Sequence, residues 1–417
     1  MATNSLYTIS MVTVDNVRNL SNNIVLARLV NRDYDSEFER GTQKIGTTLS
    51  VRKPPRYRTV QDIVANIQAE VDTVATITYA NPYNICVALN SVELGYSFEE
   101  FKKRISVPST LNIANTIDQI GLNLVTNYAF MYAGAPGTAV TSALPAASPA
   151  SAQLALQNAK VNLDRNLAPV DFGSRHCIVD PVMEATLSGS AATVFNPQAD
   201  IGDIWKSGKF TRYAGFEVYM NQQIPVHKYG TYTGTITTQT SGAAQTGSTI
   251  NIAGLTGTSG LNVGDIFTVA GVYGVNAQTG QTQSWPQPFT VTAAFSTSAS
   301  TYAVSVSPSV IASGPFQNVS QAIPNSANVT VVGASGVSSQ LAYAFHRDAV
   351  LFTNTALPDP EPGTGAIGAS MTEPETGLTI SSTRFYNGIL RQHFFRSDVM
   401  AAWAPLYPQL SSVIYTT

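Results

Sequence analysis

Leu261-Asn-Val-Gly-Asp-Ile-Phe-Thr-Val-Ala-Gly271 lies near the middle of a stretch, residues 229–340, in which Asp265 is the single charged residue. Short runs of β-branched and aromatic residues alternate there with Gly, Ser, Asn and Pro, which is typical of a sandwich or barrel. The expected strands are residues 249–252, 266–269, 289–292, 302–306 and 328–332, with a tight turn at 263–265. Because the chain on both sides has ordinary charge and aromatic content, the pattern predicts an all-β domain at 229–340, inserted into a host domain.

The composition favours a protein that forms extensive subunit contacts. Only 12% of the 417 residues are charged, about half of the usual share of roughly 25%. Depletion of Asp, Glu and Lys is typical of buried contacts, because a desolvated charge without a partner is costly. The alternative is a monomer kept soluble by Thr, Ser, Asn and Gln. The formal net charge of −3 argues against a dedicated nucleic-acid-binding protein, which normally carries a basic excess on one face.

The cysteines and the apolar runs exclude several other classes of protein. Cys86 and Cys177 are far apart in the sequence, so neither a zinc site nor a disulfide framework is predicted, and both are expected to be reduced, buried thiols. The first residues show no basic region followed by an apolar core, and no apolar run approaches the roughly 20 residues that span a bilayer. We therefore expect a protein made in the cytoplasm, with no membrane partner.

The chain begins with a helical arm and a long hairpin. Apolar residues recur at helical spacing over 15–30, and the acidic run Asp33-Tyr-Asp-Ser-Glu-Phe-Glu39 follows. A basic strand at 49–58 and a β-branched return strand at 71–79 form the expected hairpin. Pro54-Pro55 excludes the basic strand from the middle of a sheet, so the hairpin is expected to project or to lie at an edge.

The host domain mixes helices with strands. The clearest helix has an apolar stripe over 113–131, with Ser106 or Ser109 as its cap. A second helix is expected over 152–167, and Asp180-Pro181 is a start signal for a third that ends at Leu187. The expected strands are residues 177–179, 216–221, 344–352 and 379–384, before a closing stretch at 391–415. These elements predict the α+β class.

The order of these parts resembles the major capsid (coat) protein of tailed bacteriophages, which has the Hong-Kong-97-type fold. The resemblance rests on the arm, the basic hairpin, the long helix, and the runs Gly215-Phe-Glu-Val-Tyr219, Ile224-Pro225 and Phe345-His-Arg-Asp-Ala349. It extends from about Asn16 to the C-terminus. An insertion between the last two runs is similar to that of podovirus coat proteins, in which Leu261 to Gly271 resembles a characteristic strand and turn.

The resemblance implies a division of the chain and a set of partners. The implied parts are an N-terminal arm at 1–46, an extended loop at 47–96, a peripheral domain with the backbone helix at 97–135, a first axial part at 136–228, the inserted β domain at 229–340 and the axial and peripheral remainder at 341–417. The implied assembly is an icosahedral head shell of pentamers and hexamers around packaged double-stranded DNA, with scaffolding, portal and decoration proteins as partners. In relatives the insertion bears a charged loop that contacts neighbouring capsomers. Here residues 237–248 are uncharged, so we expect the insertion to stabilise its own subunit more than to bridge capsomers.

Charges on the hairpin and around the arm are complementary. Two different, complementary patches on one subunit make a head-to-tail contact, which closes into rings when the rotation permits. We predict that the hairpin binds an acidic surface on the next subunit. The alternative is a solvated basic hairpin, since most charge runs face water. The candidate interface residues are Arg52, Lys53, Arg56 and Arg58 on the hairpin, and Asp33, Asp35, Glu37, Glu39, Glu99 and Glu100 on the acidic side.

No catalytic residue, metal site or cofactor is predicted, and the chain is not expected to be an enzyme. The four histidines, His176, His227, His346 and His393, lie on separate segments without a second ligand at metal-binding spacing. No phosphate-cradling loop or metalloprotease helix motif is present in the sequence. Some relatives join Lys to Asn covalently between subunits, and Lys44 or Lys53 are formal candidates, although a surface lysine is the simpler interpretation.

The alternative function is a β-rich virion or surface protein that adheres to glycans. Tyr273, Trp285 and Phe316, in the loops of the insertion, would stack on a sugar in that case. The same aromatic residues equally complete a small core or contact a neighbouring subunit.

Overall fold

The structure is a computed structural model, and it divides the chain into two compact units, each built from segments that are distant in sequence. The first unit comprises Met1–Val51, Thr76–Gly121 and Leu351–Ala404, and the second comprises Arg52–Ala75, Leu122–Val350 and Pro405–Thr417. The residues described are 9–33, 48–59, 67–68, 70, 73–90, 100, 102–138, 151–171, 173–191, 212–238, 244–297, 301–361, 363–373, 377–389 and 392–416.

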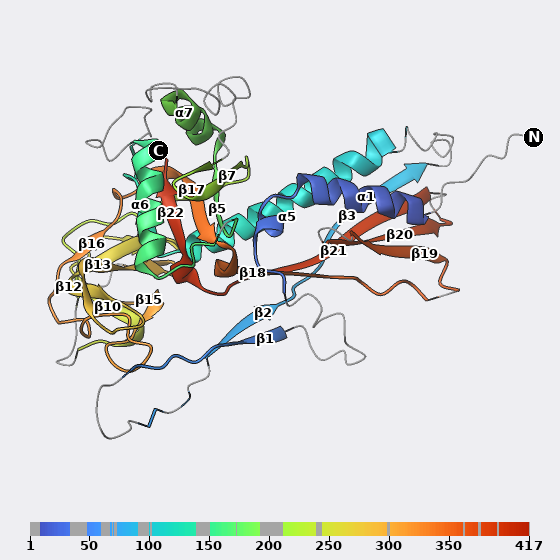
Figure 1. Cartoon of the computed structure of the whole chain (residues 1–417). Helices are drawn as coiled ribbons and strands as arrows, with labels where there is room; N and C mark the ends of the chain where they lie inside the picture. The colour runs from blue at the N-terminus through green and yellow to red at the C-terminus, as the bar shows by residue number, and fades with distance from the viewer. Residues whose placement is uncertain are drawn as a thin grey trace, which may run out of the picture. The chain divides into compact units, whose positions relative to one another are not determined.

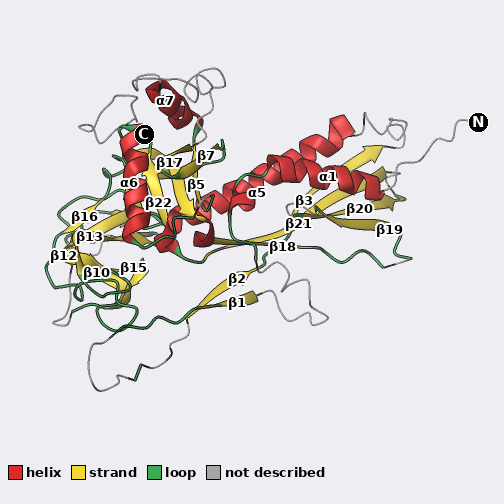
Figure 2. Ribbon diagram, viewed as in Figure 1, coloured by secondary structure: helices red, strands yellow, loops and turns green. Residues whose placement is uncertain are grey.

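The first unit is built on a five-stranded sheet in the order β18-β21-β20-β19, with β3 also paired to β21 (Figures 1 and 2). The pairs β19–β20, β20–β21 and β21–β3 are antiparallel. Helix α1 (Ile9–Asn23) packs on β19 and β20. The strands are β3 (Tyr83–Asn90), β18 (Val350–Thr355), β19 (Ala366–Thr372), β20 (Thr379–Asn387) and β21 (Gln392–Pro405).

The predicted arm helix starts earlier than expected and is broken in two. After α1 the chain bends at Ile24 and Val25, and the short helix α2 (Leu26–Leu29) follows. A carboxylate on the long helix α5 (Val107–Tyr128) holds this bend, because Oδ2 of Asp118 accepts hydrogen bonds from the backbone N–H of Val25 at 2.8 Å and of Leu26 at 3.4 Å. Asp118 is buried, so it replaces water as the acceptor for the first N–H groups of α2.

Replacing Asp118 with alanine is expected to lower the free energy of unfolding of the first unit by about 1–3 kcal/mol, because two buried N–H groups lose their acceptor. Urea denaturation of the purified subunit measures the change. Asn115→Ala, an exposed position on the same helix, is the control and should stay within about 0.5 kcal/mol of the natural chain. Equal stabilities for the two variants would show that Asp118 does not hold the bend.

The expected cap of the long helix is wrong. A π-helical turn, η2 (Lys102–Ser106), runs directly into α5, so the helix has no free start at Val107. The hydroxyl of Ser109 donates to the carbonyl of Ile105 at 2.6 Å instead of accepting from the first turn. Met131 lies beyond the end of the helix, in strand β4 (Met131–Ala133).

The second unit contains a seven-stranded sheet in the order β4-β22-β17-β5-β7-β6, with β8 also paired to β17. Its core includes Leu156 and Leu163 of α6 (Ala152–Arg165), and Met183 and Leu187 of α7 (Pro181–Ala191). The predicted start of α7 is confirmed, because the carboxylate of Asp180 accepts hydrogen bonds from the first backbone N–H groups of that helix. The other strands are β5 (Arg175–Val179), β6 (Arg212–Tyr213), β7 (Phe216–Met220), β8 (Val226–Lys228), β17 (Ser338–His346) and β22 (Ser411–Tyr415).

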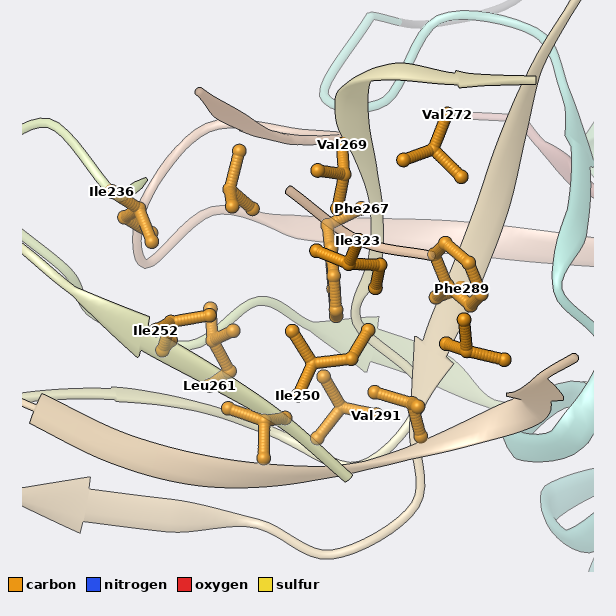
Figure 3. Packing of buried hydrophobic residues seen from close by; sticks show 14 of the residues in the cluster. Ile236, Ile250, Ile252, Leu261, Phe267, Val269, Val272, Phe289, Val291 and Ile323 are labelled. Carbon is orange, nitrogen blue, oxygen red and sulfur yellow. The ribbon is translucent and has the colours of Figure 1, made fainter. Parts of the chain in front are cut away.

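The predicted strands of residues 229–340 are found, and they enclose a hydrophobic core of their own. Figure 3 shows side chains of this cluster, among them Ile250, Phe267 and Phe289, gathered between the strands. The sheet order is β16-β12-β13-β15-β10-β9, with β11 and β14 forming a separate pair. The strands are β9 (Thr237–Thr238), β10 (Gly247–Ala253), β11 (Ser259–Leu261), β12 (Ile266–Val275), β13 (Thr282–Val291), β14 (Phe295–Thr297), β15 (Thr301–Val310) and β16 (Val329–Val331). The division into compact units keeps this β segment (residues 229–340) within the second unit, so its independence as an inserted domain stays a prediction.

Three other expectations need correction. The basic strand ends at Lys53, since β1 (Thr48–Lys53) pairs with β2 (Thr73–Thr78) and Pro54-Pro55 supplies no N–H to continue the ladder. The single strand expected at 344–352 is two, β17 and β18, separated by the 3₁₀ turn η3 (Arg347–Ala349). Cys86 is exposed on β3, whereas Cys177 is buried as expected. Burial raises the pKa of the Cys177 thiol well above its ordinary value.

Candidate subunit-interaction surface

The four basic interface candidates lie on a segment that we call the strap, residues 52–59. Arg52 and Lys53 are the last residues of β1, and the chain then continues without secondary structure through Pro54-Pro55 to Thr59. Arg52 is exposed, while Lys53, Arg56 and Arg58 are half-buried. The second half of the predicted basic strand is therefore irregular, and the cations of the strap, apart from Arg52, are partly covered.

Three of the basic side chains contact other segments of the second unit, to which the strap itself belongs. The ammonium nitrogen of Lys53 lies 5.2 Å from the ring centroid of Tyr407, and the guanidinium carbon of Arg56 lies 5.7 Å from that of Phe316. Both distances fall within the range of cation–π contacts. Nη1 of Arg58 donates a hydrogen bond to Oε1 of Gln317 at 3.1 Å.

Gln68, which precedes β2, holds the far end of the strap. Gln68 accepts a hydrogen bond from the backbone N–H of Arg58 at 2.8 Å and donates its amide to the carbonyl of the same residue. A cavity of about 260 Å³ lies against the strap, lined in part by Lys53, Arg56, Phe316 and Tyr407. The strap is thus held at several points over an incompletely filled surface.

The charged side chains of the strap are all positive. Among the described residues, no carboxylate pairs with Lys53, Arg56 or Arg58. Burial, and secondarily the neighbouring charge of Arg56, lowers the pKa of Lys53. Nε and Nη2 of Arg58 are buried without a hydrogen-bond partner. A carboxylate-bearing surface would satisfy these groups better than the present contacts do.

The acidic candidates are only partly described. Asp33 is exposed in a turn after α2, where its backbone N–H donates to Oδ1 of Asn31 at 2.9 Å. Glu100 is exposed shortly before η2. Asp35, Glu37, Glu39 and Glu99 lie outside the described residues, as does Lys44. The structure therefore groups the basic residues on one strap, and the acidic patch stays a prediction.

The single charged residue of the β segment has a role that was not predicted from the sequence. Asp265 is fully buried, and its Oδ1 lies 2.8 Å from Nε2 of His227. Its Oδ2 accepts hydrogen bonds from the backbone N–H of Gly230 at 3.0 Å and of Asn262 at 2.7 Å. We call these residues the Asp265 cluster. The available signal was an isolated carboxylate in a long uncharged stretch, because such a group is expected to be buried against specific partners.

The remaining histidines and the loop aromatics suggest no ligand site. Within the described residues, no group of three or more His, Cys, Asp or Glu side chains is placed to hold a metal ion. Burial lowers the pKa of His176 and of His346, although each lies near a carboxylate. Trp285 and Phe316, two of the three candidate sugar-stacking residues, instead lie beneath arginine side chains, Arg165 at 5.6 Å and Arg56 respectively.

Comparisons with known proteins identify the family. The sequence model of the family described as P22 coat protein, gene protein 5, matches residues 1–413. No curated protein sequence matches the chain. No described helix is both long and apolar enough to cross a membrane.

Several solved structures match the chain over most of its length. A structure from Mycobacterium phage Che8 is 11% identical, with a TM-score of 0.48, and the match covers 94% of this chain and 90% of that one. The capsid structure of cyanophage P-SCSP1u is 13% identical, with a TM-score of 0.43 and coverage of 89% and 84%. The mature capsid of bacteriophage PhiM1 is 10% identical, with a TM-score of 0.41 and coverage of 89% and 83%.

The family match confirms the resemblance to tailed-phage coat proteins, and the observed mixture of helices and sheets confirms the α+β class. Because the match covers 1–413 of the 417 residues, it includes both compact units and the β segment. The chain belongs to the P22 coat protein family.

Proposed function

We propose that this major capsid protein closes its shell through a head-to-tail contact, in which the strap of one subunit binds a carboxylate-bearing surface of the next. Membership of the coat protein family makes the chain a structural protein of the virion shell of a tailed phage. The observation that supports the contact is the set of strap cations, Lys53, Arg56 and Arg58, which have no carboxylate partner among the described residues of their own subunit.

The finer features of the assembly follow from the family resemblance. They are pentamers and hexamers in an icosahedral shell, packaged double-stranded DNA inside, and scaffolding, portal and decoration proteins as partners. A near-neutral chain suits a wall that encloses DNA without binding it tightly, because many lysine contacts to phosphate would bind nonspecifically at low salt. The mechanism is self-assembly, with Asp33, Glu100 and their acidic neighbours in the sequence as the proposed partner surface.

Charge reversal tests the contact. Arg56→Glu combined with Arg58→Glu should raise the subunit concentration needed for shell assembly by about tenfold or more, because like charges then face each other across the contact. Light scattering and electron microscopy measure assembly, and circular dichroism verifies that the subunit is folded. Lys160→Glu combined with Lys228→Glu makes the same change in net charge elsewhere in the second unit and should assemble normally.

A mixing experiment identifies the partner surface. A subunit carrying Asp33→Lys and Glu100→Lys should assemble poorly alone but better when mixed with the Arg56→Glu, Arg58→Glu subunit, because the reversed charges are again complementary. Unimpaired assembly of the strap variant would show that the strap is not the contact. Impaired assembly without rescue would leave the strap as the contact and exclude Asp33 and Glu100 as its partners.

A further inference from the structure

The strap is docked on its own subunit, and this docking surface is built from residues far away in the sequence. Arg58 and Gln317, which are joined by a hydrogen bond, are 259 positions apart. We call Phe316, Gln317 and Tyr407 the docking site. Phe316 and Gln317 follow β15 in the β segment, and Tyr407 lies between β21 and β22. All three side chains are half-buried, and Phe316 is outside the buried core of the β segment.

The docked state leaves the strap cations poorly satisfied. Nη1 of Arg58 reaches one acceptor, while its Nε and Nη2 are buried without any. Arg56 and Lys53 face aromatic rings, and no described carboxylate neutralises either of them. Burying cations without hydrogen-bond partners costs free energy, so the contacts that hold the strap are partly offset by desolvation. The docked strap is therefore weakly held.

A weakly held strap can exchange one partner for another. The docking site offers cation–π contacts and one neutral acceptor, whereas a carboxylate surface offers charge-assisted hydrogen bonds, which are stronger. The strap cannot occupy both surfaces, because the same guanidinium and ammonium groups make both sets of contacts. Docking on the subunit itself and binding to a neighbour must therefore compete.

We infer that the docking site is an intramolecular latch, which holds the strap in the free subunit and releases it when a neighbouring subunit presents carboxylates. The inference rests on the proposed head-to-tail contact and adds a resting state to it. The latch keeps Lys53, Arg56 and Arg58 of unassembled subunits half-buried. It also lowers the apparent affinity of the strap for its neighbour, which becomes the intrinsic affinity multiplied by the fraction of subunits in which the strap is free.

Phe316→Ala tests the latch without touching the strap. Loss of a cation–π contact at a partly exposed site changes an equilibrium about two- to fivefold, so the population with a free strap should rise by that factor. Trypsin cleavage after Arg56 and Arg58 measures this population, because proteolysis follows the open fraction when opening is fast. Between Arg58 and Lys102 the sequence contains no Lys or Arg, so the new fragments are identifiable by mass. The same variant should assemble at a lower subunit concentration, by up to the same factor.

Two further variants make the result specific. Gln317→Ala removes the acceptor of Arg58 and should act in the same direction as Phe316→Ala. Tyr273→Ala removes an exposed aromatic side chain of the same β segment, and should change neither cleavage nor assembly. If the strap of the Phe316→Ala variant were cleaved at the same rate as that of the natural chain, Phe316 would not hold the strap and the proposed latch would be wrong. Faster cleavage with no fall in the subunit concentration needed for assembly would show that docking on the subunit does not compete with binding to a neighbour.

Different experimental results would refute the latch and the head-to-tail contact. If the strap did not bind the neighbouring subunit, the Arg56→Glu, Arg58→Glu subunit would assemble normally whatever the cleavage rates. If only the latch were wrong, that charge-reversed subunit would still assemble poorly, while Phe316→Ala would leave assembly unchanged.

Discussion

Asp265→Ala is expected to lower the free energy of unfolding of the second unit by about 3–5 kcal/mol, because this carboxylate has several buried donors and each donor left without an acceptor costs about 1–3 kcal/mol. The substitution leaves His227 and the backbone N–H groups of Gly230 and Asn262 buried without their acceptor. These residues belong to the entry of the β segment and to the turn before β12. The substitution therefore weakens the packing of the β segment on the strands that precede it.

Urea denaturation of the purified subunit measures the loss. Asp265→Asn keeps one oxygen acceptor and should cost less than Asp265→Ala, which separates the lost hydrogen bonds from the lost charge. Lys228→Ala removes a neighbouring exposed charge and should stay within about 0.5 kcal/mol of the natural chain. A loss below about 1 kcal/mol for Asp265→Ala would show that the Asp265 cluster does not hold the β segment.

Removing the β segment should prevent normal shell formation. The backbone N–H of Gly336 donates to the carbonyl of Gly230 at 3.1 Å, and that of Tyr229 donates to Val337 at 2.9 Å, so the chain enters and leaves the segment at neighbouring points. Replacing residues 231–335 with a short glycine linker therefore does not stretch the remaining chain. The deletion nevertheless removes Asp265 and leaves His227 without its partner.

The expected result is insoluble or misassembled protein. The ring of Tyr229, fully buried and packed at 5.9 Å from that of Tyr415, becomes exposed on one side. The hydroxyl of Thr290, which donates to the carbonyl of Ala129 at the end of α5, is also lost. Soluble yield and electron microscopy measure the effect. Normal shells from the shortened chain would refute a folding role for the segment.

Local signals in the sequence were sufficient to predict most of the helices and strands. Asp180-Pro181 predicted the start of α7, because capping and the fixed backbone angle of proline act within a few residues. The strands of the β segment were predicted from alternating β-branched residues and turns, since burial on one face of a strand imposes that pattern. The long helix was predicted from its apolar stripe, although its start differs from the prediction and Met131 lies beyond its end.

Contacts between distant residues could not be predicted in the same way. The hairpin was expected to project or to lie at an edge, and nothing in Pro54-Pro55 or the arginines indicates that Phe316 and Tyr407 lie beneath them. The strand β19 was missed, since its sequence Ala-Ile-Gly-Ala-Ser-Met-Thr lacks a clear alternation and its pairing with β20 comes from the fold. His227 lies in β8 and Asp265 directly before β12, so their pairing joins residues 38 positions apart in the sequence.

Charge patterns predicted a surface but not its present partner. The basic residues of the strap were identified because their charge is opposite to that of the acidic runs, and the structure places three of them together on aromatic and amide groups of the same subunit. The sign of the charge indicated a carboxylate-bearing partner. The docking on Phe316, Gln317 and Tyr407 adds a resting state that charge alone does not predict.

Electron microscopy of the overexpressed, purified protein, with and without a co-expressed scaffolding protein, tests the central claim that this chain builds a shell by self-assembly. We expect closed icosahedral particles of uniform size, with the strap of each subunit in density that continues into its neighbour. Protein that stays monomeric under both conditions would contradict the account.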